Sequence, residues 1–388
     1  MVIPEGYKKT EMGIIPEDWE VKPLNLVAPL QRGFDLPSLK VKIGNYPVVF
    51  SNGIGAYHSN YKVKGPGVVT GRSGTIGKVH YLLCDYWPHN TTLWVTDFLG
   101  NNEKFIFYLF QTIKWENYNS GSGVPTLNRN DVHNVLCRIP AIPEQIAIAQ
   151  ALSDIDSLIA NLEKMIEKKK NIKQGAMQEL LTGKRRLPGF DGIWKEKHIG
   201  EVCEIIGGGT PSKANINWWK GNIPWISSSD LVVNSINNIT ISKHISNDAL
   251  LHSATKLCPK DSILVVSRVG VGKVAIAQFE ICTSQDFTNL VAKEHNPLFL
   301  AYLMSAIMKR NTDIQGTSIT GVTSSDISSI KIPIPSENEQ IAIASILSDM
   351  DSEIDELEKK LVKYRNIKKG MMSELLTGHI RLTEKEDA

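Results

Sequence analysis

The strongest constraint on this fold is an internal duplication, because two related segments of one chain are expected to fold alike. Residues 144–187 and 339–382 align without a gap at an offset of 195, and 28 of the 44 aligned positions are identical. Weaker similarity extends upstream, where Trp19 aligns with Trp194 at an offset of 175. The lower offset predicts about twenty extra residues in the second copy, around 215–230. The chain is therefore two copies of one unit, each a divergent part followed by a nearly constant part.

The constant part is predicted to be helical, because apolar residues recur there at alternating steps of four and three. This spacing is typical of the seam of a left-handed coiled coil. Gly183 and Gly378 follow the two helices, where a left-handed C-terminal residue is favourable. Each helix is predicted to span about 38 residues, or ~57 Å. The seam residues are Ile148, Leu152, Ile155, Ile159, Leu162 and Ile166 in the first copy, and Ile343, Leu347, Met350, Ile354, Leu357, Leu361 and Tyr364 in the second.

Each apolar seam needs a partner, and the sequence leaves two arrangements open. The seams of two chains could pair in a homodimer, or the two seams of one chain could pair with each other. We favour the second arrangement, because two matching seams already share one chain. An antiparallel pair would relate the two globular parts by an approximate twofold axis. The expected fold class is α+β, with two mixed α and β domains separated by two long helices that form an antiparallel intramolecular coiled coil.

The divergent parts are predicted to contain strands separated by glycine turns, each set followed by a short apolar helix. The expected strands are 63–70, 78–83 and 91–95 in the first part, and 262–267 and 273–279 in the second. The expected helices are 103–113 and 297–307. The expected domain boundaries are 1–143 for the first globular domain, 144–186 for the first helical region, 187–338 for the second globular domain and 339–388 for the second helical region.

Composition places the chain among ordinary globular proteins, with 42% hydrophobic and 22% charged residues. No apolar run approaches the ~18 residues that a membrane span needs, and residues 1–20 lack the apolar core of a signal peptide. The five cysteines are scattered, and none forms a CxxC pair, so neither a disulfide framework nor a zinc ribbon is supported. We therefore expect a cytoplasmic protein with no membrane association. The net charge of +2 is too small to indicate a polyanionic partner by itself.

The sequence contains no convincing catalytic set. The nine histidines are dispersed, and neither an HExxH nor a GxSxG motif occurs. The Asn-Pro-Pro-aromatic motif that amino-methyltransferases use on a flipped base is also absent. We accordingly expect no metal site, no cofactor and no catalysis by this chain, although an enzyme with an unfamiliar site is a further hypothesis.

A glycine-rich basic loop occurs between two predicted strands in each copy. The loops run from Arg72 to Lys78 and from Arg268 to Lys273. A nucleotide-binding P-loop would need Ser or Thr after the lysine, but valine follows in both loops. Two compatible interpretations are left. The glycines allow a tight hairpin turn, and the backbone amides with Arg72, Ser73, Lys78, Arg268 and Lys273 could contact DNA phosphates.

Two polar, aromatic segments supply weaker candidates for contacts with bases. In the first copy they are Ser51 and Asn52, and in the second Ser227 and Ser228. Hydroxyl and amide groups can hydrogen-bond base edges or phosphates. The tryptophans nearby are better explained by core packing. Lys213, which follows a run of three glycines, is a further candidate for DNA contact.

Charged residues on the predicted helices have several interpretations. Asp154 and Asp156 lie two positions apart and so point to different faces, as do Asp349 and Asp351. A solvated coiled-coil surface is one explanation, and docking of a protein partner is another. For the lysines, approach to DNA is a third. The candidate docking residues are Asp154, Asp156, Lys168, Asp349, Asp351 and Lys363.

The chain resembles the specificity subunit of type I restriction-modification systems. Three features carry the resemblance, and together they cover almost the whole chain. They are the opening segments Gly6-Tyr7-Lys8-Lys9-Thr10 and Ile15-Pro16-Glu17-Asp18-Trp19, the repeated Glu-Gln-Ile-Ala at residues 144 and 339, and the helix exit Glu-Leu-Leu-Thr-Gly at residues 179 and 374. Any one of these motifs is weak evidence, but their tandem spacing is specific.

The resemblance implies two target-recognition domains, each reading one half of a bipartite, asymmetric site on double-stranded DNA. The helices would set the unspecified spacer and dock two methylation subunits. In this family the methylation subunits transfer methyl groups to adenine N6, and ATP-dependent cleavage belongs to restriction subunits. The resemblance further implies that residues 1–16 pack beside the C-terminal helix. The competing hypothesis is a coiled-coil scaffold for proteins that reads no DNA sequence.

Overall fold

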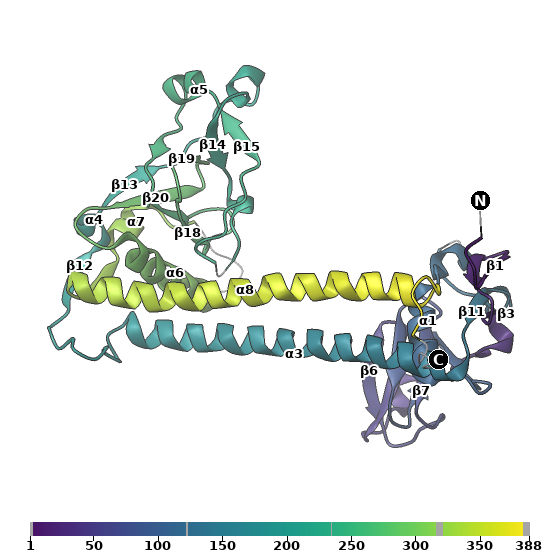
Figure 1. The fold of residues 1–388 in the computed structure, drawn as a ribbon. Coiled ribbons are helices and arrows are strands. Elements are labelled where there is room, and N and C mark those ends of the chain that lie inside the picture. The colour runs from purple at the N-terminus through teal and green to yellow at the C-terminus, as the bar shows by residue number, and fades with distance from the viewer. Residues whose placement is uncertain (1–2, 122, 234, 316–320, 383–388) are drawn as a thin grey trace, which may run out of the picture. The chain divides into compact units, whose positions relative to one another are not determined.

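The computed structural model describes residues 3–121, 123–233, 235–315 and 321–382 of the 388-residue chain (Figure 1). Its internal contacts divide the chain into two compact units. Unit 1 comprises residues 1–163 and 360–388, and unit 2 comprises residues 164–359. Each unit therefore combines one divergent globular part with portions of both long helices.

Unit 1 contains two main sheets. One is a four-stranded antiparallel sheet in the order β4-β10-β7-β8, and the other is a three-stranded sheet in the order β6-β5-β9. Two strand pairs, β1-β2 and β11-β3, complete the unit. The elements are β1 (Tyr7–Thr10), β2 (Gly13–Pro16), β3 (Glu20–Pro23), η1 (Leu24–Leu26), β4 (Leu30–Arg32), η2 (Ser38–Lys40), β5 (Tyr46–Phe50), β6 (Gly53–His58), β7 (Gly67–Gly71), β8 (Val79–Leu82), β9 (Trp87–Pro88), β10 (Thr92–Val95), α1 (Glu103–Thr112), η3 (Trp115–Tyr118), α2 (Arg129–Val132) and β11 (Leu136–Ile139).

Unit 2 repeats this plan with two four-stranded sheets. Their orders are β13-β20-β17-β18 and β15-β14-β19-β16, and a pair β12-β21 corresponds to β3-β11. The elements are β12 (Lys195–His198), α4 (Ile199–Val202), β13 (Cys203–Gly207), η4 (Ile216–Trp219), β14 (Ile223–Ile226), η5 (Ser228–Asp230), β15 (Lys243–Ile245), α5 (Asn247–His252), β16 (Leu257–Cys258), β17 (Ile263–Val266), β18 (Val274–Ile276), β19 (Ile281–Thr283), β20 (Phe287–Ala292), α6 (Pro297–Gln315), α7 (Ser324–Ser329) and β21 (Lys331–Ile334).

Most predicted elements are confirmed, with differences at their ends. The strand expected over 63–70 begins only at Gly67, while Val63 pairs separately with Tyr86 in an isolated bridge. Between them, Pro66 has no N–H group to donate to a continuous ladder. The strand expected over 273–279 ends at Ile276, and the helix expected over 297–307 continues to Gln315. The predicted position of the extra residues is wrong. They lie between β14 and β17, where 36 residues stand in place of the 16 that separate β5 from β7.

The two long helices are α3 (Ile142–Leu180) and α8 (Glu337–Leu375), each of 39 residues. Pro143 lies in the first turn of α3, where an N–H group would have no acceptor within the helix. A proline therefore costs no helical hydrogen bond at this position. Gly183 and Gly378 have φ angles of 71° and 78°, as the predicted left-handed caps require. After Gly378, the N–H of His379 donates to the carbonyl of Glu374 over 3.0 Å, which satisfies a carbonyl at the helix end.

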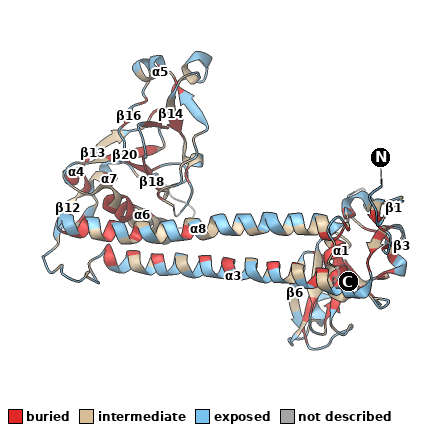
Figure 2. Ribbon diagram, in the orientation of Figure 1, coloured by how far each residue is buried: buried red, intermediate tan, exposed pale blue. Residues whose placement is uncertain are grey.

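Within each unit the portions of α3 and α8 run antiparallel and pair in the same way. In unit 1, Arg365 forms an ion pair with Glu163 over 2.6 Å. In unit 2, Lys170 pairs with Glu358 over 2.6 Å, and these two residues align with Arg365 and Glu163 in the duplication. Buried and half-buried positions alternate with exposed ones along both helices (Figure 2). Of the predicted seam, Leu162, Ile166 and Ile354 are buried, whereas Ile159, Leu357 and Leu361 are half-buried. The expected antiparallel pairing within one chain is therefore confirmed inside each unit.

Polar residues interrupt the seam at one matched place in each unit. In unit 2 the ammonium of Lys173 contacts Asp351, and the hydroxyl of Tyr302 donates to the same carboxylate over 2.7 Å. In unit 1, Lys368, Asp156 and Tyr108 are arranged alike, with the tyrosine hydroxyl 2.8 Å from the aspartate. Burial and the neighbouring carboxylate raise the pKa of each tyrosine above its usual value. A polar group in a helix seam favours one register, because other registers would leave it unpaired.

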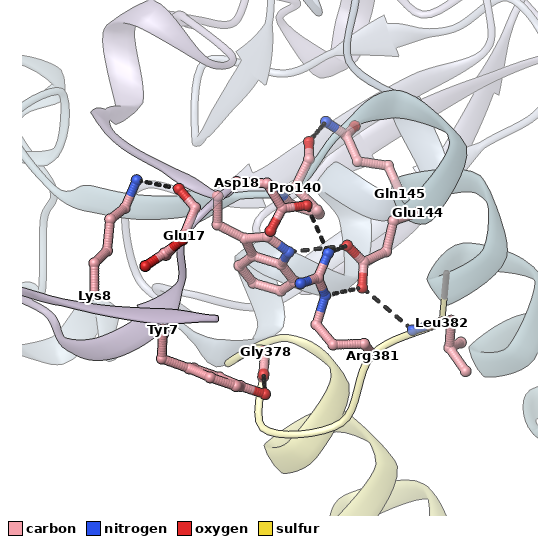
Figure 3. A network of polar contacts seen from close by, with 11 residues as sticks. Tyr7, Lys8, Glu17, Asp18, Pro140, Glu144, Gln145, Gly378, Arg381 and Leu382 are labelled. Carbon is pink, nitrogen blue, oxygen red and sulfur yellow. Dashed lines mark hydrogen bonds and ion pairs between the residues drawn. The ribbon is translucent and has the colours of Figure 1, made fainter. Parts of the chain in front are cut away.

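Each unit contains a buried, hydrogen-bonded carboxylate near the start of a long helix. In unit 1, Glu144 accepts two hydrogen bonds from Arg381, at 2.8 and 2.9 Å, and one from the indole of Trp19 at 2.9 Å (Figure 3). In unit 2, Glu339 accepts from Arg186 at 2.7 and 2.8 Å and from Trp194 at 3.1 Å. We call each set the carboxylate clamp. It joins the start of one long helix to the exit of the other.

The N-terminal segment packs at the end of α8, as expected. The hydroxyl of Tyr7 donates to the carbonyl of Gly378 over 3.1 Å, and Asp18 forms an ion pair with Arg381 over 2.6 Å (Figure 3). Pro16 lies directly against Gly378, where a Cβ atom would come within 2.6 Å of its ring. The first and last parts of the described chain therefore belong to one unit.

The clamp should be important for stability. Replacing Arg381 with alanine is expected to lower the free energy of unfolding by about 3 kcal/mol, because the buried carboxylate of Glu144 loses its charged partner. Urea denaturation of the full chain measures the change. Arg185→Ala is the matched control. Its side chain is 75% exposed, so its loss should change the free energy by less than about 0.5 kcal/mol. Equal effects of the two substitutions would contradict a structural role for the clamp.

Candidate nucleic-acid interface

The first basic loop connects β7 to β8 in unit 1 and is fixed by backbone hydrogen bonds. The N–H of Arg72 donates to Thr91 over 2.8 Å, and the carbonyl of Arg72 accepts from Leu127 over 2.8 Å. Gly74 and Gly77 have φ angles of 83° and 75°, which confirms a turn that needs glycine. The guanidinium of Arg72 is half-buried, and this burial with nearby Arg32 lowers its pKa below the usual value.

The loop meets the predicted polar segment of the first copy. The ammonium of Lys78 donates to the carbonyl of Asn52 over 2.6 Å. The N–H of Ser51 donates to the hydroxyl of Thr91, the residue that also anchors Arg72. The structure therefore brings Arg72, Ser73, Lys78, Ser51 and Asn52 together, although Ser51 is buried while Asn52 is exposed.

The second basic loop connects β17 to β18 in unit 2 and has the same surroundings. The N–H of Arg268 donates to the carbonyl of Asp286 over 3.3 Å, and its side chain is exposed. The ammonium of Lys273 donates to the carbonyl of Ser228 over 2.8 Å, as Lys78 does to Asn52. A groove beside Arg268 contains no acidic residue among its described lining residues, which include Gly208, Gln285 and Thr323. Each unit therefore has one glycine-rich loop that carries an arginine and a lysine.

Two of the predicted contact residues have other surroundings. The hydroxyl of Ser227 donates its proton to Asp230 over 2.7 Å within a capping box, so this hydroxyl is left only as an acceptor. Lys213 does not join the loop of Arg268. It lies beside Trp219, Lys220 and Lys243 in a separate groove.

The predicted docking residues divide into two groups. Asp156 and Asp351 are occupied within the chain by a lysine and a tyrosine each. The other four are exposed on the surfaces of α3 and α8, and these are Asp154, Lys168, Asp349 and Lys363. Whether any of the six docks a partner stays a prediction.

Sequence reasoning missed the lysine and tyrosine partners of these aspartates. The signal was available, because Tyr108 and Tyr302, like Lys368 and Lys173, align between the copies. Also missed was a groove in unit 1 that is lined by Lys40, Lys42 and Lys62 together with Tyr46 and Tyr61. Its residues come from separate segments with no shared spacing, so no motif could reveal it.

Within the described part of the chain, no group of three or more His, Cys, Asp or Glu side chains could hold a metal ion. None of the helices described there is long and apolar enough to cross a membrane. Cys137, Cys203, Cys258 and Cys282 are buried, and burial raises the pKa of each thiol to about 11 or 12.

Comparison with known protein families gives one consistent result. The sequence profile of a family described as "Type I restriction modification DNA specificity domain" matches residues 16–174 and 192–363. The MjaX specificity subunit of Methanocaldococcus jannaschii is similar, with 27% identity over 97% of this chain and 97% of its own length. The EcoR124I/EcoR124II specificity subunit of Escherichia coli is 29% identical over 64% of this chain and 63% of its own.

Solved structures share the fold. The S subunit of a type I restriction-modification system from M. genitalium matches with a TM-score of 0.63 and covers 92% of this chain and 96% of its own. A chain from a structural study of type I R-M system assembly matches with a TM-score of 0.59 and covers 94% and 99%. Identity is 16% in both cases, so these matches concern the fold alone.

His80 lies beside the first basic loop, and it should make stability depend on pH. Burial lowers its pKa, the cation of Lys78 lowers it further, and a backbone contact with Ser51 partly opposes this. The unfolded chain therefore binds more protons than the folded chain below about pH 6.5, so stability should fall as the pH falls. Urea denaturation at about pH 7.5 and 5.5 measures the difference in the free energy of unfolding between the two pH values.

The substitution His80→Gln should reduce this difference in stability. Burial also lowers the pKa of His89 and of His133, so part of the difference in stability should persist in this variant. An undiminished difference in His80→Gln would show that the imidazole does not contribute.

Proposed function

The chain belongs to the type I restriction-modification DNA specificity family, and from this premise we propose that it is the sequence-specific DNA-recognition subunit of such a system. One observation carries the proposal: the family profile matches both copies of the duplication. Each divergent part would read one half of a bipartite site on double-stranded DNA. We propose domain boundaries of 1–143 and 187–338 for the two readers, and 144–186 and 339–388 for the helical regions.

The loops between β7 and β8 and between β17 and β18 are the proposed contacts with the DNA backbone. Each presents an arginine, a lysine and glycine amides on a loop that neighbouring strands hold in place. Arginine, lysine and backbone N–H groups are the usual partners of phosphate oxygens, and these contacts fix the register of a protein on the duplex. Side chains beside the loops would then contact the bases, and Asn52 and Ser228 are the candidates.

The two readers are expected to prefer different sequences. The basic loops differ by one residue in the spacing from arginine to lysine, and a carbonyl of Asn52 in one unit is replaced by that of Ser228 in the other. The segment between β14 and β17 is also longer than its counterpart. Unlike readers imply an asymmetric site whose two halves have unrelated sequences.

The chain is proposed to act by recognition and assembly, without catalysis of its own. Two methylation subunits would dock on the helical regions, with the exposed Asp154, Lys168, Asp349 and Lys363 as candidate contacts. Restriction subunits would join the full complex. Methyl transfer to DNA by this chain alone would contradict the assignment.

Nuclease footprinting with the methylation subunits tests the recognition role against the alternative of a protein scaffold. Two protected half-sites at a fixed separation would support recognition. No protection, in a complex that assembles normally, would favour the scaffold. Mapping of methylated adenines in the host genome gives the half-site sequences independently.

Arg268→Ala should weaken binding to all duplex sequences and reduce the salt dependence of binding. One lost phosphate contact is expected to lower the slope of log affinity against log salt by about 0.9. Fluorescence anisotropy across a salt series measures the slope. Lys256→Ala, an exposed lysine of the same unit outside the loop, is the control. A loss confined to one base position would instead assign Arg268 to base reading.

The lengths of α3 and α8 should set the length of the spacer. Inserting seven residues after Lys168 and seven after the aligned Lys363 would lengthen each helix by about 10.5 Å while preserving the seam. The preferred spacer is expected to grow by about three base pairs, since one base pair rises 3.4 Å. Methylation mapping reads the spacer directly.

A matched insertion of seven residues after Gly189, in the segment that follows α3, leaves both helices unchanged and should leave the spacer unchanged. Altered half-site sequences in the helix variant, with the spacer constant, would overturn the proposed role of the helices.

A further inference from the structure

A basic groove lies on the smaller sheet of unit 1, and its described lining residues include none from the β7–β8 loop. We call it groove 1. It is formed by η2, the strands β5 and β6 and the residues after β6. The rings of Tyr46 and Tyr61 contact each other there with centroids 4.9 Å apart, and the ammonium of Lys62 lies 5.1 Å from the ring of Trp87. Groove 1 is lined by Leu36, Leu39, Lys40, Lys42, Tyr46, His58, Ser59, Asn60, Tyr61, Lys62 and Trp87.

A second basic groove lies on the corresponding sheet of unit 2, and we call it groove 2. The ammonium of Lys243 lies 5.5 Å from the ring of Trp225, and this ring packs edge-on against Trp219 at 5.0 Å. Groove 2 is lined by Lys213, Trp219, Lys220, Gly221, Ser242, Lys243 and His244.

The two grooves occupy related positions in the duplicated fold. Strands β5 and β6 pair antiparallel with Pro47 opposite Tyr57, and β14 and β15 pair with Pro224 opposite His244. Just before each first strand is a glycine, Gly44 or Gly221, at which a Cβ atom would overlap the neighbouring backbone. At both grooves the chain therefore brings a glycine into the same close contact with the end of the paired strand.

Both grooves have an unbalanced positive charge. Each has three lysines and a histidine among its described lining residues, and no aspartate or glutamate. The lysine ion pairs of the described chain involve other residues, on the long helices and at β3 and β21. Lysines that fold without an acidic partner beside them are available to an external anion.

The charge recurs although the side chains differ. Only the close-packed glycine and the strand pairing are shared. The lysines of groove 1 lie at the end of η2, between η2 and β5, and after β6, whereas those of groove 2 lie after β13, after η4 and in β15. The two divergent copies thus present the same positive charge in their grooves through different residues. A common requirement for an anionic partner explains this more directly than inheritance of a motif.

We propose that grooves 1 and 2 bind phosphates of duplex DNA outside the bases that each unit reads, so that each reader holds the duplex at two surfaces. The proposal rests on the proposed function. Lysine suits this role because its ammonium is a point charge that binds phosphate without demanding a fixed geometry. The rings of Trp87 and Trp225 hold the ammonium groups of Lys62 and Lys243 beside the grooves, which reduces the freedom that binding would remove.

The test compares three lysine variants of the full chain. The groove 1 variant carries Lys40→Gln, Lys42→Gln and Lys62→Gln, and the groove 2 variant carries Lys213→Gln, Lys220→Gln and Lys243→Gln. The control carries Lys195→Gln, Lys256→Gln and Lys260→Gln, which remove the same charge from exposed positions of unit 2 outside both grooves. All nine lysines lie on the surface outside the apolar core, so circular dichroism should show that each variant folds like the parent.

Binding is measured by fluorescence anisotropy on a mixed-sequence duplex of about 40 base pairs across a salt series. Each groove variant should lower the slope of log affinity against log salt by about two, the value for two lost phosphate contacts, and the control by less than about 0.5. Hydroxyl-radical footprints on a duplex that carries the mapped site should lose protection only outside the half-site of the altered unit.

The outcomes separate the two proposals. If the groove variants bind like the control while Arg268→Ala loses affinity, the grooves do not contact DNA and the recognition role stands. If a groove variant loses protection inside its half-site, the groove reads bases, and its assignment to flanking phosphates is wrong. A parent chain that does not retain the duplex even at about 50 mM salt would overturn both proposals.

Discussion

In each unit one buried carboxylate joins segments that are far apart in the sequence. Glu144 is 4% exposed, and its oxygens are bonded to Arg381 from beyond α8 and to Trp19 from the opening segment. Glu339 is bonded in the same way to Arg186 and Trp194. A buried carboxylate is strongly unfavourable without such partners, so each clamp stabilises its unit only when the arginine and the indole are both in place. The rest of each unit is arranged around that junction.

The glutamine that follows each clamp residue extends the same junction. Gln145 donates to the carbonyl of Pro140 over 3.0 Å and accepts from the N–H of Asn102, the residue that caps α1. Gln340 repeats both bonds with Pro335 and Asn296. The repeated Glu-Gln pair thus connects the last strand, the long helix and the short helix of each unit. This gives a physical reason for its identity in the two copies.

Near-identity of the two helical segments therefore has a cause inside the chain. Asp156, Lys368 and Tyr108 form one seam contact, and their counterparts form the other. If the identical residues were retained only for identical external partners, they would be expected at exposed positions. Many of them instead form the clamps, the seam pairs and the glycine caps. Exposed helix positions such as Lys168 and Lys363 are left as the candidates for docking.

The sequence predicted those parts of the fold that depend on local pattern. The alternating steps of four and three set the two helices, and paired glycines with flanking valines set the β7–β8 and β17–β18 hairpins. The clamps could not be predicted, because nothing local connects Trp19 with Arg381. The offset of the duplication counted the extra residues of unit 2 correctly but not their position, since divergent strands gave no alignment between β14 and β17. The neighbours of Lys213 could not be predicted for the same reason, because the pairing of strands brings Lys220 and Lys243 beside it.

The division of the chain between its units has a consequence for biosynthesis. Unit 2 is one continuous stretch, residues 164–359, whereas unit 1 is assembled from both ends of the chain. A ribosome releases the N-terminal portion first, yet that portion lacks Arg381 and the second half of its helix pair until residues 360–381 have been translated. Unit 2 can complete its core while Glu144 of unit 1 still lacks its partner Arg381. The domain that is translated first is thus the one that must finish folding last.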